Sequence, residues 1–518
     1  MQPLIISLVI ALLFAIPKMD SANNPPDPLN LDARSLSQML KSGEISAEQV
    51  MTATLDRIDD LNPKYNAIIA LRDRSTLLEE ARQCDRELQK YQQQSSSNNN
   101  DNDNNDNIGR RRLLCGIPIA IKDMANVVGL PTTKGGSMLH YYNNYPSVSD
   151  PFVQRMVEDE GAIVIGKTNT PELGVGSHTF NTRWGTTVNP YDTSKSAGGS
   201  SGGAAVAIAT RMLCLADGSD MMGSLRNPAG WNGIYSHRPT AGMMDEDDSS
   251  VNPLPYPITT PGPMARNPMD VAFLLDIMAG NDKFDCEKVP EIPNVDGMKI
   301  AWLGNLNLLP VEDGILPLCK QALTSFSSSH GGVAVTDMRE TPFDVGELWK
   351  SWTTIRSKII SGNFDYVPKQ WLRLFLLVAP IREELKWEVR RGLDITEEQC
   401  REAADIAMAW SMKLETLFSE YDALALPTSQ VWPFPKERKW PKEIAGKEMD
   451  TYHRWMEITV PGSLAGLPCT TIPAGVGENG LPIGIQLLGA RGEDAKLLKL
   501  AQAYCNAINL PGDNTPVA

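Results

Sequence analysis

One serine in a run of small and polar residues could act as a nucleophile. Residues 218–227 read GSDMMGSLRN, and Ser224 lies there between a glycine and a leucine. A serine hydroxyl attacks only when a base takes its proton, and histidine is the commonest base. The chain of 518 residues has five histidines, and none adjoins Ser224: they are His140, His178, His237, His330 and His453. If Ser224 is a nucleophile, a different group must accept its proton.

Two other stretches match known motifs by their letters alone. GAIVIGKT (161–168) matches a phosphate-binding loop, but its four central residues are apolar and predict a buried strand where a flexible loop is needed. GGSSG (198–202) matches the nucleophile elbow of α/β-hydrolases, which needs a strand leading into the serine. The polar turn NPYDTSKSA precedes it instead. We therefore expect neither nucleotide binding nor a Ser-His-Asp triad.

Three segments, two of which contain the stretches quoted above, carry a lysine or a serine among glycines and apolar residues. They read GIPIAIKDMANVVGLPTTKGG with Lys122, KSAGGSSGGAAVAIA with Ser200, and GSDMMGSLRNPAG with Ser224. Their residue types, order and spacing resemble the amidase signature family. The resemblance continues through GKTNTPELGVGSHTFNTRWGTTVNPYDTSKSAGGSSGG, YDALALPTS and PGSLAGLPCTTIPAGVGENGLPIGIQLLG, and it covers about residues 31–510.

The resemblance implies a catalytic set of serine, cis-serine and lysine. Ser224 takes the position of the nucleophile, Ser200 that of the bridging serine after a cis bond, and Lys122 that of the base. Four consecutive amides match the family's oxyanion hole, and four residues match its supporting positions. The oxyanion residues are Met221, Met222, Gly223 and Ser224, and the supporting residues are Gly199, Ser201, Asp220 and Arg226. A solvated ion pair is the alternative interpretation of Asp220 and Arg226.

A lysine can act as this base only when it is neutral. The pKa of a free lysine is about 10.4, and burial lowers it because burial disfavours the charged form. Lys122 follows the apolar run GIPIAI, which we expect to be an interior strand. Alternation along a strand places Asp123 on the opposite face, where it would not oppose the shift. We expect a neutral Lys122 that deprotonates Ser200, which deprotonates Ser224; the alternative is a strand-end lysine that reaches solvent.

The oxyanion segment departs from the family pattern at one residue. Most members have two glycines before the nucleophile, whereas this chain has Met222 and then Gly223. A side chain there would narrow the site or shift an amide, which affects rate and substrate range more than the reaction type. The resemblance implies an amidase that hydrolyses a small-molecule amide through an acyl-enzyme on Ser224, with no cofactor and no metal. Two alternatives stay open: an amidotransferase-like subunit that passes ammonia to a partner, and a non-catalytic binding pseudoenzyme of the same fold.

Strands that alternate with helices must position these residues. Buried strands are predicted at 116–121 and 162–166, and a small-residue helix at 204–210 follows the glycine run. Serines with a glutamine three residues on, Ser35 and Ser46, predict capping boxes of N-terminal helices. Together with the resemblance, this pattern predicts the α/β class. We expect the amidase signature fold, a mixed central β-sheet covered by α-helices on both faces, as one amidase domain over residues 28–512.

Two regions within this domain have unusual composition. Residues 92–107, QQQSSSNNNDNDNNDN, are polar and of low complexity, and we expect a disordered surface insertion. Residues 290–440 hold long helical patterns, and the resemblance makes them the variable substrate-pocket region. Seven tryptophans there either line an apolar pocket or, as we favour, pack in the ordinary core; they are Trp349, Trp352, Trp371, Trp387, Trp410, Trp432 and Trp440.

Charge and cysteine usage narrow the class of partner. The net charge of −15 and pI near 5.0 argue against a nucleic-acid partner, which needs clustered lysine and arginine. The eight cysteines are spread without a CxxC pair, so neither a disulfide framework nor a zinc site is expected, and most should be buried free thiols. Whether the chain forms a homodimer stays open.

The N-terminus suggests a targeting segment. Within residues 1–22, Leu4–Ile16 reads LIISLVIALLFAI and holds no charged residue. A run of this length is too short to span a bilayer, which takes about 20 residues, and suits the core of a signal peptide. We expect a secreted or secretory-pathway protein. The alternative is a cytoplasmic protein with a buried or interfacial apolar N-terminus, so membrane association stays open.

Overall fold

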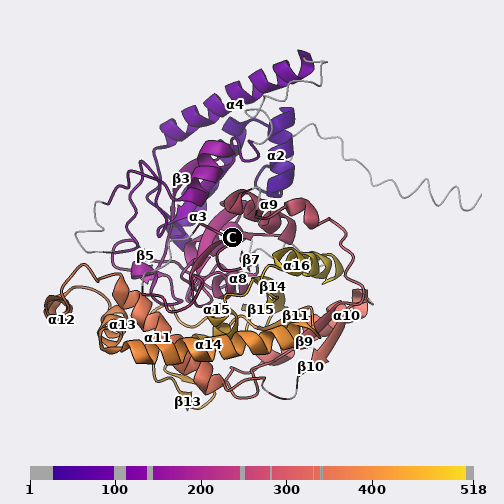
Figure 1. Ribbon diagram of the computed structural model, residues 1–518. Coiled ribbons are helices and arrows are strands. Elements are labelled where there is room, and N and C mark those ends of the chain that lie inside the picture. The colour runs from indigo at the N-terminus through magenta and orange to yellow at the C-terminus, as the bar shows by residue number, and fades with distance from the viewer. Residues whose placement is uncertain are drawn as a thin grey trace, which may run out of the picture.

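A mixed sheet of eight strands lies at the centre of the computed structural model (Figure 1). Its order is β10 (Ala334–Asp337), β9 (Lys299–Trp302), β11 (Ala423–Pro427), β15 (Pro482–Leu488), β14 (Cys469–Val476), β7 (Tyr235–Arg238), β8 (Thr260–Ala265) and β6 (Leu215–Asp220). β9 pairs in parallel with β10 and β11, and the other pairs are antiparallel. The structure describes residues 27–97, 112–136, 144–245, 251–280, 283–330, 332–338, 340 and 342–508.

A smaller sheet carries the predicted base. Its order is β1 (Ile68–Ile69), β3 (Ile163–Thr168) and β2 (Pro118–Lys122), with β2 and β3 parallel. The backbone amide of Lys122 donates to the Asp217 carboxylate of β6 at 2.9 Å, which joins this sheet to the edge of the larger one. Two short hairpins complete the strands: β4 (Phe180–Asn181) with β5 (Gly185–Thr186), and β12 (Glu443–Ile444) with β13 (Lys447–Glu448).

Helices cover the sheets on both sides, as the sequence predicted. α4 lies at the top of Figure 1 and α14 at the bottom, with the large sheet between them. The helices are α2 (Ala33–Ser42), α3 (Ala47–Tyr65), α4 (Arg74–Ser97), α6 (Pro151–Gln154), α7 (Gly202–Ala209), α8 (Arg226–Asn232), α9 (Pro268–Ala279), α10 (Ile315–His330), α11 (Val345–Gly362), α12 (Lys369–Val378), α13 (Glu383–Asp394), α14 (Glu397–Phe418), α15 (Val460–Leu464) and α16 (Asp494–Ile508).

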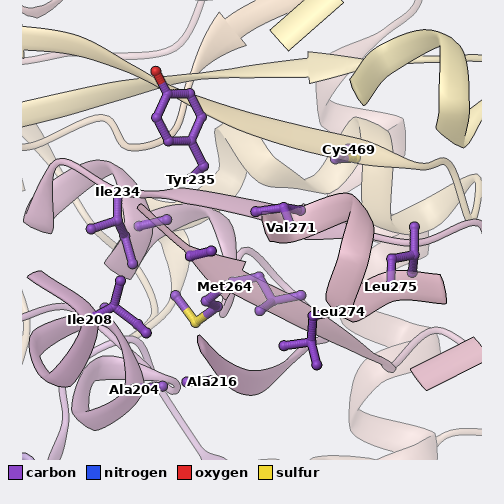
Figure 2. Packing of buried hydrophobic residues seen from close by; sticks show 14 of the residues in the cluster. Ala204, Ile208, Ala216, Ile234, Tyr235, Met264, Val271, Leu274, Leu275 and Cys469 are labelled. Carbon is purple, nitrogen blue, oxygen red and sulfur yellow. The ribbon is translucent and has the colours of Figure 1, made fainter. Parts of the chain in front are cut away.

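Apolar side chains from both halves of the chain form one continuous core. Figure 2 shows Ala204 and Ile208 of α7 with Ala216 of β6 and Met264 of β8, all of them buried. The small residues of α7 let the helix pack closely on β8 and on β6, the strand that leads to Ser224. A second, smaller cluster joins α11, α12 and α13.

Local signals predicted some elements and missed others. Ser46 forms the expected capping box with Gln49, whereas α2 is capped by Asp32, whose carboxylate accepts from the Ser35 amide at 2.8 Å. Ser35 is therefore inside the helix and is not its cap. The string at 161–168 forms strand β3, which confirms that it is not a phosphate-binding loop.

The expectation of a disordered insertion at 92–107 is wrong for residues 92–97, which belong to helix α4. α4 continues to Ser97, because glutamine and serine are acceptable helix residues and a regular helix already precedes them. The Gln92 side chain also donates to the carbonyl of Lys41 at 2.8 Å, which fixes it to α2. Residues 98–107 and the apolar segment 1–22 lie outside the described residues. Among the helices that the structure does describe, none is long and apolar enough to cross a bilayer.

Candidate active site

Lys122 ends strand β2 inside the protein and is only 1 % exposed. Its Nζ lies 2.8 Å from Oγ of Ser200 and 2.8 Å from Oγ of Ser201. Ser219 of β6 adds its hydroxyl at 3.0 Å. The side chain therefore ends among three serine hydroxyls and does not reach solvent, so the interpretation of Lys122 as a solvent-facing lysine is wrong.

Burial sets the charge of this lysine. Desolvation lowers the pKa of Lys122 to about 7, and the carboxylates of Asp217 and Asp220 oppose the shift. A large fraction of Lys122 is then neutral near neutral pH, as a base requires. Asp123 points elsewhere, as the sequence predicted, and accepts from the amides of Thr133 at 2.8 Å and Gly135 at 3.0 Å. The sequence alone did not indicate that the two carboxylates of β6 lie close enough to Lys122 to oppose the shift in its pKa.

The glycine run places Ser200 beside the lysine. The peptide bond between Gly199 and Ser200 is cis, as the resemblance implied. Gly198 has φ +79°, and a Cβ there would lie 2.6 Å from Oδ1 of Asn227, so a side chain has no room. The next amide, that of Ser201, donates to the carbonyl of Ser224 at 3.3 Å. The run thus connects the lysine to the turn that holds the predicted nucleophile.

Ser224 lies in the turn between β6 and α8, and Asp220 shapes that turn. The Asp220 carboxylate accepts from the amide of Gly223 at 2.7 Å and from the amide of Leu225 at 3.1 Å. Gly223 has φ +83°, and a Cβ there would lie 2.7 Å from the Thr459 side chain, so this position requires glycine. The turn presents Ser224, which is 8 % exposed, at the wall of a cavity.

The predicted oxyanion hole is correspondingly smaller. Because the Gly223 amide is bound to Asp220, it is not a free donor, and its assignment to the oxyanion hole is wrong in this structure. The amides of Met221, Met222 and Ser224 donate to no acceptor among the residues described. These three amides are the ones that a developing oxyanion could use.

Asp220 and Arg226 form a buried ion pair. Neither side chain is exposed to solvent, and Arg226 donates through Nε and Nη2 to the two carboxylate oxygens at 3.0 Å each. Burial by itself would raise the pKa of Asp220, but Arg226 and Arg238 hold it below its usual value. Arg226 also donates to Oε1 of Gln486 at 2.7 Å. The solvated-pair interpretation is therefore wrong, and the pair is a rigid support of the nucleophile turn.

Two side chains of α11 hold the methionines before the nucleophile. Nε1 of Trp352 donates to Sδ of Met222 at 3.1 Å, and Nη1 of Arg356 donates to Sδ of Met221 at 3.3 Å. Trp352 and Arg356 are four residues apart, so they lie on one face of the helix. Sequence reasoning missed both contacts, because nothing in the order of residues predicts that α11 reaches this loop.

Ser200 and Ser224 share one cavity of about 660 Å³. Polar and apolar groups contribute about equally to its lining, two cations (Lys134 and Arg356) border it, and no carboxylate does so among the described residues. The region 290–440 contributes α11 and the residues that follow it. Its apolar lining includes Met124, Leu173, Val175, Ile258, Ile359, Ile360, Phe364, Leu385 and Met456.

The seven tryptophans of this region do not line the cavity, which confirms ordinary packing as their role at the buried positions. Trp352 and Trp410 are almost fully buried, and Nε1 of Trp410 donates to the carbonyl of Pro461 at 3.0 Å. Trp371 on α12 and Trp387 on α13 are exceptions, because both are exposed.

The histidines that the structure shows are bound elsewhere. His178 contacts Oγ of Ser196 at 2.7 Å, and burial lowers its pKa to about 4. His237 contacts Oδ1 of Asp494 at 2.9 Å, and burial lowers the pKa of His453 to about 3. None of these three borders the cavity. His140 and the side chain of His330 lie outside the described residues.

Cysteines and acidic groups offer no metal ligand set in the part of the chain that the structure describes. All eight cysteines are free thiols. Half of them are buried and half are partly exposed, so the expectation that most are buried was too strong.

Several known proteins are similar to this chain in sequence. The sequence profile of the family described as Amidase matches residues 49–498. An acylamidase of Rhodococcus erythropolis is 30% identical over 486 residues, which are 92% of this chain and 94% of that protein. The A subunit of the glutamyl-tRNA(Gln) amidotransferase of Thermotoga maritima is 28% identical over 92% of this chain and 96% of that protein.

Solved structures show the same fold. A bacterial aryl acylamidase of the amidase signature family aligns with a TM-score of 0.78 and 25% identity, over 92% of this chain and 96% of that one. The peptide amidase of Stenotrophomonas maltophilia aligns with a TM-score of 0.72 and 25% identity over the same shares. The fold and the relatives define an amidase, a hydrolase that acts on amide carbon–nitrogen bonds. The chain belongs to the amidase signature family.

Proposed function

We propose that the protein hydrolyses a carboxylic amide through an acyl-enzyme on Ser224, with Lys122 as the base and Ser200 as the bridge. The observation that carries the proposal is the 2.8 Å contact between Nζ of the buried Lys122 and Oγ of Ser200. Ser200 and Ser224 line the same cavity, so a substrate there would meet both hydroxyls.

The first half-reaction forms an ester bond and breaks the amide bond. Neutral Lys122 accepts the proton of Ser200, and Ser200 accepts that of Ser224, whose Oγ attacks the carbonyl carbon. The developing oxyanion takes hydrogen bonds from the free amides of Met221, Met222 and Ser224, which are held in place before the reaction starts. The proton then passes to the nitrogen that leaves as amine or ammonia.

The second half-reaction releases the acid. A water molecule takes the place of the departed amine and gives a proton to Ser200, which passes its own proton to Lys122, and the resulting hydroxide attacks the ester carbonyl. The ester bond breaks, and the proton on Lys122 returns through Ser200 to the Ser224 oxygen, so that Lys122 is neutral again. The carboxylic acid leaves and gives its proton to solvent to become the carboxylate. Each half-reaction uses the same proton path in opposite directions.

Two observations bear on the alternatives. The pseudoenzyme hypothesis rested on Met222, but its side chain is 2 % exposed and packs against Trp352, while its amide stays free. This arrangement supports catalysis over mere binding. The similarity to the amidotransferase subunit of Thermotoga maritima keeps an ammonia-transferring role as a second candidate.

Covalent labelling tests the proposed nucleophile. The purified chain should react with a fluorophosphonate, and mass spectrometry should find the adduct on Ser224 and not on Ser200 or Ser201. The Ser224→Ala variant should show no adduct and almost no turnover of short aliphatic, aryl and long-chain amides. An adduct on another residue, or full activity in Ser224→Ala, would contradict the proposal.

The amidotransferase candidate predicts a different pattern of activity. A subunit of that kind should show little hydrolysis alone and should act on glutamine only when a partner protein is bound. The proposed amidase should hydrolyse at least one amide as the isolated chain. Hydrolysis of glutamine that depends on a co-purified partner would favour the second candidate.

A further inference from the structure

Helix α12 and the residues before it carry an apolar surface that is open to solvent. The described residues expose sixteen large apolar side chains, and six of them lie within residues 366–378. Of the helix itself, only Leu372 and Leu376 are buried. Single exposed apolar residues are ordinary, but a concentration of this kind marks a contact surface. The six are Tyr366, Trp371, Leu374, Phe375, Leu377 and Val378.

The two charged residues of segment 366–378 are cations, and one exposed carboxylate, that of Asp365, directly precedes the segment. Lys369 and Arg373 are the charged residues of 366–378, in a chain whose net charge is −15. Both are exposed, and Arg373 also contacts Asp394 of α13. A short amphipathic helix with cations, a tryptophan and large aliphatic residues suits the interface of an anionic bilayer.

The surface borders the active-site cavity. Figure 1 shows α12 at the outer edge of the molecule, away from the central sheet. A shallow apolar groove of about 500 Å³ runs along the helix, lined by residues of 364–378. Two of those residues, Phe364 and Tyr366, also line the cavity that holds Ser200 and Ser224. The apolar surface and the cavity are therefore continuous.

We propose that residues 366–378 dock on an anionic lipid surface, with α12 lying in the plane of the interface. The apolar side chains would enter the acyl boundary, and the cations would face lipid phosphates and carboxylates. A second copy of the chain is a poorer occupant. A two-fold contact through this short helix would set Lys369 and Arg373 against the same two cations.

Vesicle binding tests the proposal without any amide substrate, so its failure is distinct from failure of the proposed amidase. The full chain should cosediment with vesicles of phosphatidylcholine and phosphatidylserine, and more weakly with phosphatidylcholine alone. Replacing three exposed residues together, Leu374→Gln, Leu377→Gln and Val378→Gln, should reduce binding by about tenfold or more. Lys369→Glu should weaken binding to the anionic vesicles several-fold and leave binding to the neutral ones nearly unchanged.

A matched triple variant is available as the control. Ile292, Leu308 and Val476 are also exposed apolar residues, and they lie outside 366–378. Their joint replacement by glutamine should leave vesicle binding unchanged. All variants alter exposed side chains, so circular dichroism and the melting temperature should match those of the wild type.

Hydrogen exchange locates the contact. Peptides that cover residues 366–378 should gain protection when anionic vesicles are added. Three outcomes would overturn the proposal. They are no vesicle binding by the wild type, equal binding by the wild type and the α12 variant with protection elsewhere, and a wild-type dimer that the α12 variant converts to a monomer without any lipid effect.

Discussion

The indole nitrogen of Trp352 donates a hydrogen bond to the sulfur of Met222 at 3.1 Å. Met222 stands where the resemblance to the amidase signature family implies a glycine, and its amide is one of the three unbound donors of the turn, with those of Met221 and Ser224. The added side chain is thus accommodated by a specific partner on α11. The methionine at this position therefore links the oxyanion segment to α11, the helix that lines the cavity.

Removing that donor should slow the chemical step more than it weakens substrate binding. Trp352→Phe keeps an aromatic ring but loses the N–H, and loss of one hydrogen bond of about 1 kcal/mol should lower kcat by about fivefold. KM should change less, because the amides act on the transition state. Steady-state kinetics measures both.

Trp410→Phe is the matched control for Trp352→Phe. It also removes a buried indole N–H, which donates to Pro461 and not to the oxyanion segment. This variant should lose stability without a selective loss of kcat. If both variants reduce kcat equally, the sulfur contact has no special role.

The pH dependence should follow the charge of Lys122. Its pKa of about 7 means that the lysine is protonated below pH 7 and cannot accept a proton there. We expect kcat/KM to rise with pH through about 7 and to level off above it. Lys122→Arg stays charged at all accessible pH values and should abolish activity.

The histidines supply the control for this profile. Burial lowers the pKa of His178 to about 4, so it is neutral throughout the range measured. His178→Gln should leave the inflection where it is. An inflection that moves in this variant, or that persists with full rate in Lys122→Arg, would exclude the lysine as the base.

Lys122 should also make the free energy of unfolding increase with pH. Its pKa is about 7 in the folded protein and about 10.4 in the unfolded chain, so between these values the unfolded state binds more protons. The contribution of this residue to the free energy of unfolding should therefore rise as pH increases from 7 to 10. Denaturation at pH 7 and pH 9.5 should show a larger gain for the wild type than for Lys122→Met.

Comparison of the two proteins isolates the lysine, because all other titrating groups are shared. The Lys122→Met variant should be the more stable of the two at pH 7, where folding of the wild type buries the lysine and releases about half of the proton that its unfolded chain holds. Equal gains in both proteins between pH 7 and pH 9.5 would show that Lys122 stays charged when folded.

Variants of Ser200 and Ser201 should distinguish a serine that relays the proton from one that only positions Lys122. Both hydroxyls lie 2.8 Å from Nζ of Lys122, but Ser200 lines the cavity and Ser201 is fully buried. Ser200→Ala should lower kcat by several orders of magnitude because it interrupts the proton path. Ser201→Ala removes an equivalent contact and should have a much smaller effect on kcat. Equal losses would assign both serines to positioning of the lysine.

The sequence predicted the parts of the site that depend on local pattern. The apolar run before Lys122 predicted a buried strand, and burial in turn predicted a lowered pKa of the lysine. The cis bond at Ser200 came from resemblance to the family and not from the residues themselves.

Contacts between distant segments could not be predicted in this way. The Gly223 amide is taken by Asp220, and Met221 and Met222 are bound by α11, more than a hundred residues later in the chain. Asp217, on the adjacent edge strand of the other sheet, opposes the shift in the pKa of Lys122. Such pairs depend on how the sheets and helices pack against one another. The periodicity of a single sequence does not predict that packing.

Arg226 has a consequence for when the enzyme first becomes active. Its partners are Asp220, six residues earlier, and, far downstream, Thr459, Ser463 and Gln486. During translation the segments with Lys122, Ser200 and Ser224 therefore leave the ribosome long before the groups that brace the nucleophile turn. A nascent chain at that stage contains every reactive group but lacks the downstream residues that hold the nucleophile turn in place. Hydrolysis should therefore begin only when synthesis is nearly complete.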